Sequence, residues 1–174
     1  SACQPDRLDA KVLALYSSHP MIRIQNLYFH YPGEHPALRD IDLEIHPGES
    51  VAIIGANGSG KTTLAHCLNG LQTPSTGCVL VDDMDTRDGE KLGLIRRKVG
   101  MVFQNPDDQL VATTVEGELA FGLENLALPR SEMIERVDRA LIDFDLLSYR
   151  TAPPHRLSGG EKQRLAIAAA SAMR

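Results

Sequence analysis

Short alternations of apolar and polar residues dominate the chain from residue 22 to residue 46. The pattern is clearest at Ile41, Leu43 and Ile45, which are separated by charged residues. A period of two residues is typical of half-buried strands, because successive side chains point to opposite faces of a sheet. With a turn at residues 31–34 (Tyr-Pro-Gly-Glu), this stretch predicts antiparallel strands.

Three later apolar runs predict further strands. Residues 51–54 (Val-Ala-Ile-Ile) are apolar on both faces, as in a strand that is covered on both sides. Residues 78–81 (Cys-Val-Leu-Val) and 99–103 (Val-Gly-Met-Val-Phe) predict two more.

Helical spacing begins at Lys61 and dominates beyond Gln104. The first predicted helix runs from Lys61 to about Asn69 and is stopped by Gly70. Three more helices are predicted: one with Val115, Leu119 and Leu123 on one face, one from a Ser131 cap to about Phe144, and one that starts near Ser158.

This order of elements predicts an α/β protein with one main domain. Residues 1–20 show no sustained period and are expected to be a leader or a loosely attached segment. Residues 21–174 are expected to form the domain, with residues 105–160 as a helical subdomain.

Composition argues against several classes of protein. Apolar residues make up 43% and charged residues 24% of the 174 residues, close to the globular average and unlike a disordered chain. A net charge of −5 has the wrong sign for a protein whose main partner is a phosphate backbone. Aromatic residues make up only 5%, which disfavours stacking of single-stranded nucleic acid, and no run of 18 apolar residues predicts a membrane span.

A glycine-rich loop is the clearest chemical signal in the sequence. Residues 55–62 match G-x-x-x-x-G-K-[ST] between an apolar run and a predicted helix. In such a loop the backbone N–H groups point inward and bind phosphate at a helix N-terminus. Lys61 is expected to neutralise the β- and γ-phosphates, Thr62 to bind Mg²⁺ and Thr63 to reach the α-phosphate side. The other expected nucleotide contacts are Gly55, Ala56, Asn57, Gly58, Ser59 and Gly60. A glycine-rich turn that precedes Lys-Thr by chance is the alternative, and the context favours ATP or GTP binding.

A second motif, Leu-Ser-Gly-Gly-Glu-Lys-Gln-Arg at residues 157–164, stands where the last helix should begin. Two glycines at a helix N-terminus, with a serine hydroxyl beside them, are suited to a second anion site. A plain serine N-cap on an alanine-rich helix explains the same residues equally well.

The second motif resembles the signature of ATP-binding-cassette (ABC) ATPases in every position. The resemblance implies a P-loop NTPase (RecA-like) core with an N-terminal antiparallel β layer and a helical subdomain. It also implies a head-to-tail dimer with two ATP molecules between the subunits. Ser158, Gly159 and Gly160 of one subunit would then cover the γ-phosphate held by the loop of the other.

Two further positions take their expected roles from the same resemblance. Tyr31 is similar to the aromatic residue that stacks on adenine, and an ordinary tyrosine at a strand end is the alternative. Gln104 resembles the glutamine that contacts Mg²⁺ and the attacking water, so the expected metal contacts are Thr62 and Gln104. With Lys61 and Ser158, Gln104 completes the expected catalytic set.

Residues 104–111 and 114–125 narrow the resemblance to the ATPase subunit of energy-coupling factor (ECF) transporters, which import vitamins and cobalt or nickel ions. One departure is Gly117, where that pattern usually has an acid. The implied partners are a second ATPase subunit, a transmembrane coupling subunit and a substrate-binding membrane subunit, with no nucleic acid. The implied location is peripheral, on the cytoplasmic face of the membrane. A separate membrane subunit chooses the cargo, so this sequence does not identify it.

The negative charge is concentrated in the predicted helical lobe. Residues 105–150 hold ten acidic and four basic side chains, whereas the rest of the chain is nearly neutral. A solvated helical face explains most of these acids. Our hypothesis is that Asp107, Asp108 and neighbouring acids receive basic coupling helices of the transmembrane partner.

The family pattern also needs an apolar strand ending in Asp-Glu after the signature helix, and then a histidine. None of these residues lies between the signature and Arg174, so we expect the chain to be cut and these 174 residues to hydrolyse ATP poorly. Residues 79–83 (Val-Leu-Val-Asp-Asp) are similar to such a strand but precede Gln104, which is the wrong order.

Two other functions compete with transport. ATPases of the DNA-repair or DNA-tethering type carry a similar signature but insert a long coiled coil, and the 53 residues at 105–157 are too few for that arm. A non-catalytic nucleotide-binding subunit remains open.

Overall fold

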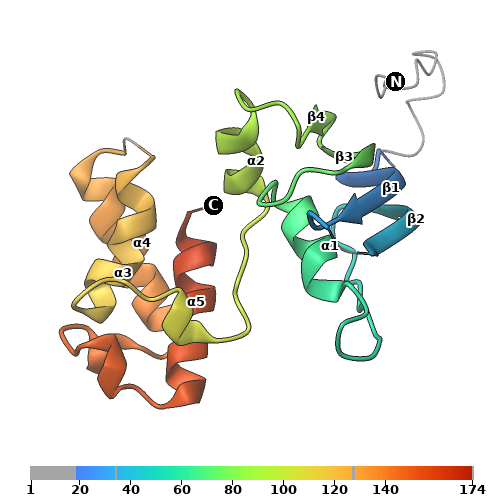
Figure 1. The fold of residues 1–174 in the computed structure, drawn as a ribbon. Helices are drawn as coiled ribbons and strands as arrows, with labels where there is room; N and C mark the ends of the chain where they lie inside the picture. The colour runs from blue at the N-terminus through green and yellow to red at the C-terminus, as the bar shows by residue number, and fades with distance from the viewer. Residues whose placement is uncertain (1–18, 34, 127, 174) are drawn as a thin grey trace. The chain divides into compact units, whose positions relative to one another are not determined.

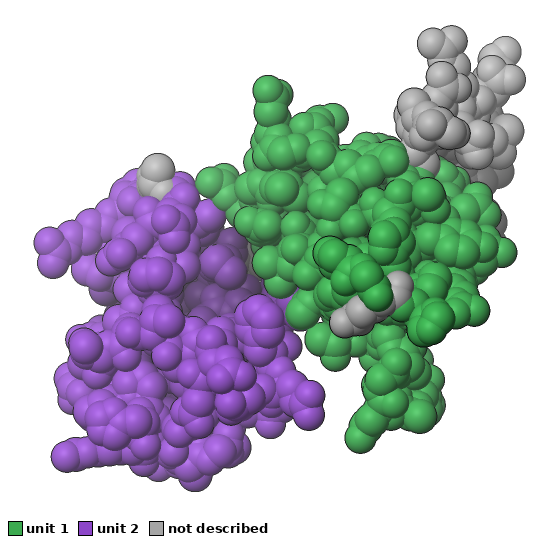
Figure 2. All heavy atoms as spheres, in the orientation of Figure 1, with its two compact units in different colours: residues 1–99 green, residues 100–174 purple. Residues whose placement is uncertain are grey.

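The structure is a computed structural model that describes residues 19–33, 35–126 and 128–173 (Figure 1). The predicted leader at residues 1–20 lies outside the described residues except for its last two. The chain divides into two compact units, residues 1–99 and 100–174, which Figure 2 shows in green and purple. The helical subdomain that the sequence predicts at residues 105–160 has different bounds from either unit, and it stays a prediction.

A four-stranded antiparallel sheet forms the framework of the first unit. Its strands are β1 (Ile22–His30), β2 (Pro36–Ile45), β3 (Thr76–Val81) and β4 (Met84–Asp85), in the order β2-β1-β3-β4. Ile24 of β1 pairs with Leu43 on one side and with Val79 on the other. The antiparallel strands and the turn predicted within residues 22–46 are therefore confirmed, as is the strand at 78–81.

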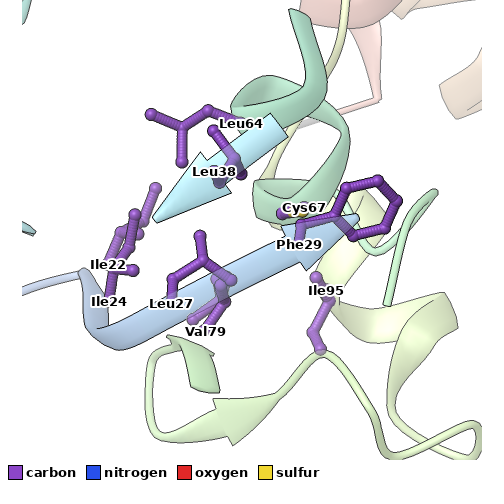
Figure 3. Packing of buried hydrophobic residues seen from close by; sticks show 10 residues of the cluster. Ile22, Ile24, Leu27, Phe29, Leu38, Leu64, Cys67, Val79 and Ile95 are labelled. Carbon is purple, nitrogen blue, oxygen red and sulfur yellow. The ribbon is translucent and has the colours of Figure 1, made fainter. Parts of the chain in front are cut away.

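Two helices complete the first unit. They are α1 (Lys61–Leu68) and α2 (Leu92–Lys98), of which the sequence predicted only α1. The α1 residues Leu64 and Cys67 pack beside Leu38 and Phe29 of the sheet (Figure 3). Gly70 stops α1 as predicted, with a φ of 69° that favours glycine.

The strands predicted at 51–54 and 99–103 are wrong for this structure, which has neither. Val51 and Ile53 are each 44% exposed, and Ile54 is 94% exposed. A strand needs a hydrogen-bonded neighbour, and no described strand pairs with either run. Apolar composition alone therefore did not specify a strand at these positions.

The second unit is helical. Its helices are α3 (Val115–Glu124), α4 (Arg130–Asp143) and α5 (Gly159–Ala172), with 3₁₀ turns η1 (Pro106–Asp108), η2 (Leu147–Tyr149) and η3 (Pro154–Arg156). Leu119, Leu141 and Leu165, one from each long helix, are fully buried in a common core. These helices confirm the predicted helical character beyond residue 104.

The N-terminus of α4 differs from its prediction in one detail. Ser131 was expected to cap this helix, but α4 begins at Arg130 and its N-cap is Pro129, with no side-chain cap. The reason is that the Met133 N–H already donates to the Pro129 carbonyl at 3.1 Å, which places Ser131 inside the first turn.

Among the described residues, no helix combines the length and the apolar character needed to cross a bilayer.

Candidate nucleotide-binding site

The glycine-rich loop at residues 55–60 leads directly into α1. Gly58 and Gly60 have φ values of 79° and 91°, in the left-handed region that glycine adopts readily. A Cβ atom on Gly60 would lie 2.6 Å from the Ala37 carbonyl oxygen and 2.9 Å from Leu38 Cδ2. Gly60 is therefore required both by its backbone angle and by the close approach of β2.

Lys61 places its positive charge over this loop. Its Nζ donates to the carbonyl oxygens of Gly55 and Ala56, each at 2.8 Å, and lies 3.4 Å from Ser59 Oγ. None of the ion pairs in the described part of the chain involves Lys61, and the first turn of α1 holds no acid. The ammonium charge adds to the partial positive charge of the helix N-terminus, so the loop attracts an anion.

The exposure of the loop suits a ligand. Ala56, Asn57, Gly58 and Ser59 are exposed, as is Thr62 at the second position of α1. The oxygen of the Thr62 hydroxyl, beside the loop, can serve as a metal ligand. Mg²⁺ is usually bound by a few protein oxygens together with substrate phosphates. The described residues contain no cluster of three His, Cys, Asp or Glu side chains that would hold a metal by itself.

Tyr31 and Thr63 come together beside the loop. The Tyr31 hydroxyl lies 3.3 Å from Thr63 Oγ1, which is buried with only 7% of the residue exposed. The edge-to-face contact between the rings of Phe29 and Tyr31 has a centroid distance of 4.9 Å and an interplanar angle of 86°. Tyr31 is therefore held by both its ring and its hydroxyl.

The signature residues form the N-terminus of α5 in the second unit. Ser158 is the N-cap, and Glu161 closes a capping box with it. The Ser158 N–H and Oγ each lie 2.7 Å from Glu161 Oε2, and the Glu161 N–H donates back to Ser158 Oγ at 3.4 Å. The serine is thus the N-cap that the sequence allowed, and its hydroxyl remains on the surface.

Hydrogen bonds stabilise the ionised form of Glu161. The hydroxyl of Tyr149 and then the side chain and backbone of Ser158 donate to its carboxylate and lower its pKa to about 2. The same bond raises the pKa of Tyr149. Glu161 is therefore anionic whenever the protein is near neutral pH.

Gly159 and Gly160 have no packing reason to be glycine. Both are exposed, both have ordinary helical backbone angles, and a Cβ on either would meet nothing within 4 Å. Glycine in a helix costs about 1 kcal/mol relative to alanine. An open N-terminus without side chains suits a ligand or a second chain that approaches the backbone closely.

Gln104 lies ahead of η1 in the second unit and is exposed. The neighbouring Phe103 N–H is held by Gln109 Oε1 at 3.1 Å, which ties this segment to the start of the helical unit. The phosphate loop, Tyr31 and Thr63 belong to the first unit, whereas Gln104 and the signature belong to the second.

Three interactions of the second unit were missed by the sequence analysis. Lys162 Nζ bonds Asp107 Oδ1 at 2.6 Å, Glu118 Oε2 accepts from the N–H groups of Val111 and Ala112 at 2.9 and 2.7 Å, and Tyr149 bonds Glu161. Each joins groups that are separated by several residues or by a loop. The burial of Glu118, at 5% exposure, is visible only in the folded chain, and the sequence alone did not mark these partners.

The Asp82–Asp83 pair proves to be a hairpin turn. Both residues have positive φ values, 45° and 60°, between β3 and β4. Asp82 pairs with Lys98, and Asp83 lies 2.8 Å from His19 Nε2. The acids that resembled a metal-binding strand end are explained by turn geometry.

Known sequences resemble this chain along most of its length. A family model described as "ABC transporter" matches residues 38–174. The energy-coupling factor transporter ATP-binding protein EcfA of Methanosarcina acetivorans is 54% identical over 148 residues, which cover 85% of this chain and 54% of that protein. EcfA1 of Enterococcus faecalis is 50% identical over 157 residues, 89% of this chain and 56% of that protein. The chain therefore spans about half the length of these curated relatives.

Solved structures show the same fold. CbiO1 from Clostridium perfringens, described as part of the ABC transporter complex cbiONQ, superimposes with a TM-score of 0.79 at 36% identity, covering 88% of this chain and 62% of that one. A dimeric ATP-binding cassette in a post-hydrolysis state, bound to ADP and Pi, gives a TM-score of 0.77 at 33% identity, covering 87% and 69%.

Proposed function

Because this chain belongs to the ABC transporter family, we propose that it is the ATP-binding subunit of an importer of the energy-coupling factor type. In this proposal it binds ATP between two subunits and couples hydrolysis to substrate uptake through membrane partners. The observation that carries the proposal is the phosphate loop, where Gly60 fits tightly against β2 and the Lys61 charge has no carboxylate partner among the described residues.

The nucleotide contacts follow from the chemistry of the loop. Lys61 exchanges the carbonyl oxygens of Gly55 and Ala56 for β- and γ-phosphate oxygens, a stronger charge-assisted interaction. The N–H groups of the loop and of the first turn of α1 donate to the same phosphates. Mg²⁺ would be held by Thr62 and Gln104 together with phosphate oxygens, and it would neutralise charge on the transferred phosphate. Tyr31 offers a ring to adenine.

The signature of a second subunit completes each site. Ser158 reorients its hydroxyl proton from Glu161 to a γ-phosphate oxygen, while Glu161 keeps the Ser158 N–H. Gly159 and Gly160 allow the backbone N–H groups of α5 to approach that phosphate, which accounts for two glycines that packing does not require. The dimer is head-to-tail because loop and signature come from different subunits.

The partners are those of an ECF importer. They are a second ATPase subunit, the same chain or a related one, a transmembrane coupling subunit and a substrate-binding membrane subunit, on the cytoplasmic face of the membrane. The energy-coupling factor names of the relatives at 50–54% identity support this choice. A non-catalytic nucleotide-binding subunit would share the binding site but not the turnover.

Equilibrium binding of ATP by the chain tests the proposal. Lys61→Ala removes the loop charge and should weaken ATP binding at least about tenfold, since a hydrogen bond to a charged group contributes about 1.5–3 kcal/mol. The matched control is Lys91→Ala, which removes an exposed lysine paired with Asp88 at 3.3 Å and should leave binding unchanged. Equal affinities for the two variants, or no binding by the unaltered chain, would contradict the proposal.

Phosphate release by the same proteins separates binding from turnover. We expect residues 1–174 to bind ATP with little steady-state release, because the family's water-polarising Glu and switch His follow the signature helix and neither is among these residues. Rapid release that Lys61→Ala abolishes would show that another carboxylate of these residues polarises the water.

A further inference from the structure

The hydroxyl of Tyr31 makes a contact that adenine stacking does not need. It lies 3.3 Å from Oγ1 of Thr63, the third residue of α1. We propose that Tyr31 is a positioning residue that orients the Thr63 hydroxyl toward the phosphate nearest the nucleoside. This inference rests on the proposed function, because it concerns the same nucleotide site.

Either hydroxyl could donate in this contact, and the proposal assigns the donor role to Tyr31. A hydroxyl has one proton to donate and two lone pairs that accept. A threonine inside a helix commonly donates its hydroxyl proton to a carbonyl oxygen one turn back. The proton is then not available to bond a ligand. When Tyr31 donates to Thr63 Oγ1, it occupies one lone pair and leaves the Thr63 proton free for a phosphate oxygen.

The burial of Thr63 favours a lasting hydrogen bond between its hydroxyl and that of Tyr31. Thr63 is only 7% exposed, and a buried hydroxyl without a partner would cost stability. Tyr31 is itself fixed, because its ring meets the Phe29 ring edge to face and packs against the core of the first unit. The Tyr31 hydroxyl therefore reaches Thr63 from a packed position at the end of β1.

Both residues lie in the same compact unit as the phosphate loop, so the contact does not depend on the arrangement of the two units. Thr63 follows Thr62 and Lys61 directly, on the first turn of α1, whose N–H groups would face the phosphates in the proposed site. Tyr31, which directly follows β1 and is proposed to stack on adenine, would thereby be linked through one hydrogen bond to the phosphate end of the site.

The proposed roles of the Tyr31 hydroxyl and the Tyr31 ring involve different parts of a nucleotide. Stacking requires a base, whereas the Thr63 contact requires only a phosphate. Tripolyphosphate, which has three linked phosphates and no nucleoside, therefore distinguishes the two roles. Tyr31→Phe keeps the ring and removes the hydroxyl. Tyr28→Phe is a matched control because Tyr28 is 38% exposed and lies in β1, three residues before Tyr31.

The test measures the affinity of the chain for ATP, ADP and tripolyphosphate. Tyr31→Phe should weaken all three by a similar factor of about three to ten, the usual effect of one hydrogen bond. Thr63→Val should show a similar loss, and adding Tyr31→Phe to it should cost nothing further because the two groups act as a unit. Thr63→Ser, which keeps the hydroxyl, should recover most of the affinity lost in Thr63→Val and retain its sensitivity to Tyr31→Phe.

Three results would overturn the inference while leaving the proposed function intact. They are unchanged affinities in Tyr31→Phe, losses that add in the double variant, and a loss for ATP and ADP without one for tripolyphosphate. If the unaltered chain binds none of the three ligands, the proposed function fails and the inference fails with it. A lower thermal midpoint of Tyr31→Phe with unchanged affinities assigns the contact to stability alone and also overturns it.

Discussion

At the residue scale, the phosphate loop and the signature motif differ in how their charged side chains are paired. Lys61 bonds only neutral oxygens, so its charge remains available to an anion. Glu161 is surrounded by donors from Tyr149 and Ser158, so its charge is used within the protein. In the proposed function the loop would therefore attract phosphate by its charge, whereas the signature would offer neutral N–H groups beside a carboxylate that is already hydrogen-bonded.

The Glu161 carboxylate should make folding stability depend on pH. Its pKa in the folded protein, about 2, lies below its ordinary value of 4.5. Its stabilising contribution is therefore complete above about pH 5 and is lost as the pH falls from about 4.5 toward 2. Glu161→Gln, which keeps the shape but not the charge, should lower the urea midpoint at pH 7, and the difference from the unaltered protein should shrink by pH 3.

Glu124→Gln is the control for that comparison, because Glu124 forms no ion pair with any described residue. Its urea midpoint should follow that of the unaltered protein at every pH. A difference between Glu161→Gln and the unaltered protein that stays constant from pH 7 to pH 3 would contradict the assigned hydrogen bonds.

At the element scale, the sequence predicted the helices that begin at a recognisable motif, α1 and α5, better than α2 or strands inferred from apolar composition at 51–54 and 99–103. The hydrogen bonds of α1 and α5 are local, and their caps at Gly60 and Ser158 are part of the same short motifs. The runs at 51–54 and 99–103 needed neighbouring strands that composition does not supply. The antiparallel β1–β2 pair was predictable because a short turn brings its two strands together.

The signature glycines lead to a prediction about α5. Gly159→Ala and Gly160→Ala should each raise the free energy of unfolding by up to about 1 kcal/mol, because alanine favours a helix and neither Cβ meets an obstacle. If the proposed dimer forms, the same substitutions should weaken its MgATP-driven assembly, because the new methyl groups would stand where the γ-phosphate is proposed to approach. Urea unfolding and sedimentation velocity with and without MgATP measure the two effects.

Gly93→Ala is the matched control for the signature glycines. Gly93 lies in α2, where an added Cβ also meets nothing within 4 Å. It should raise stability similarly and leave dimerisation unchanged. If the signature variants dimerise as well as Gly93→Ala, the glycines have no role at the ATP interface.

At the scale of the whole molecule, the fold class and the phosphate loop could be predicted from contiguous motifs, but the pairing of charges could not. Many acids of the helical unit are paired within it. Arg150 bonds both Glu116 and Asp138 at 2.7 Å, and Asp107 bonds Lys162 at 2.6 Å. These partners lie 12 to 55 residues apart in sequence, so only the folded chain reveals them. The acidic surface open to a partner is therefore smaller than the sequence suggests.

This pairing selects the residue for a docking test. Asp107 and Asp108 were both hypothesised to receive basic helices of the membrane partner, but Asp107→Lys would place a cation beside Lys162 at the signature helix. Asp108 is exposed and forms no ion pair with a described residue, so Asp108→Lys changes the surface alone. It should release the membrane subunit when the full-length protein is purified from detergent-solubilised membranes, while ATP affinity stays unchanged.

Asp143→Lys, at another acid without an ion pair among these residues, is the matched control and should retain the subunit. If both variants retain the membrane subunit equally, basic helices do not dock at Asp108; if both lose it, only the overall charge of the helical unit matters.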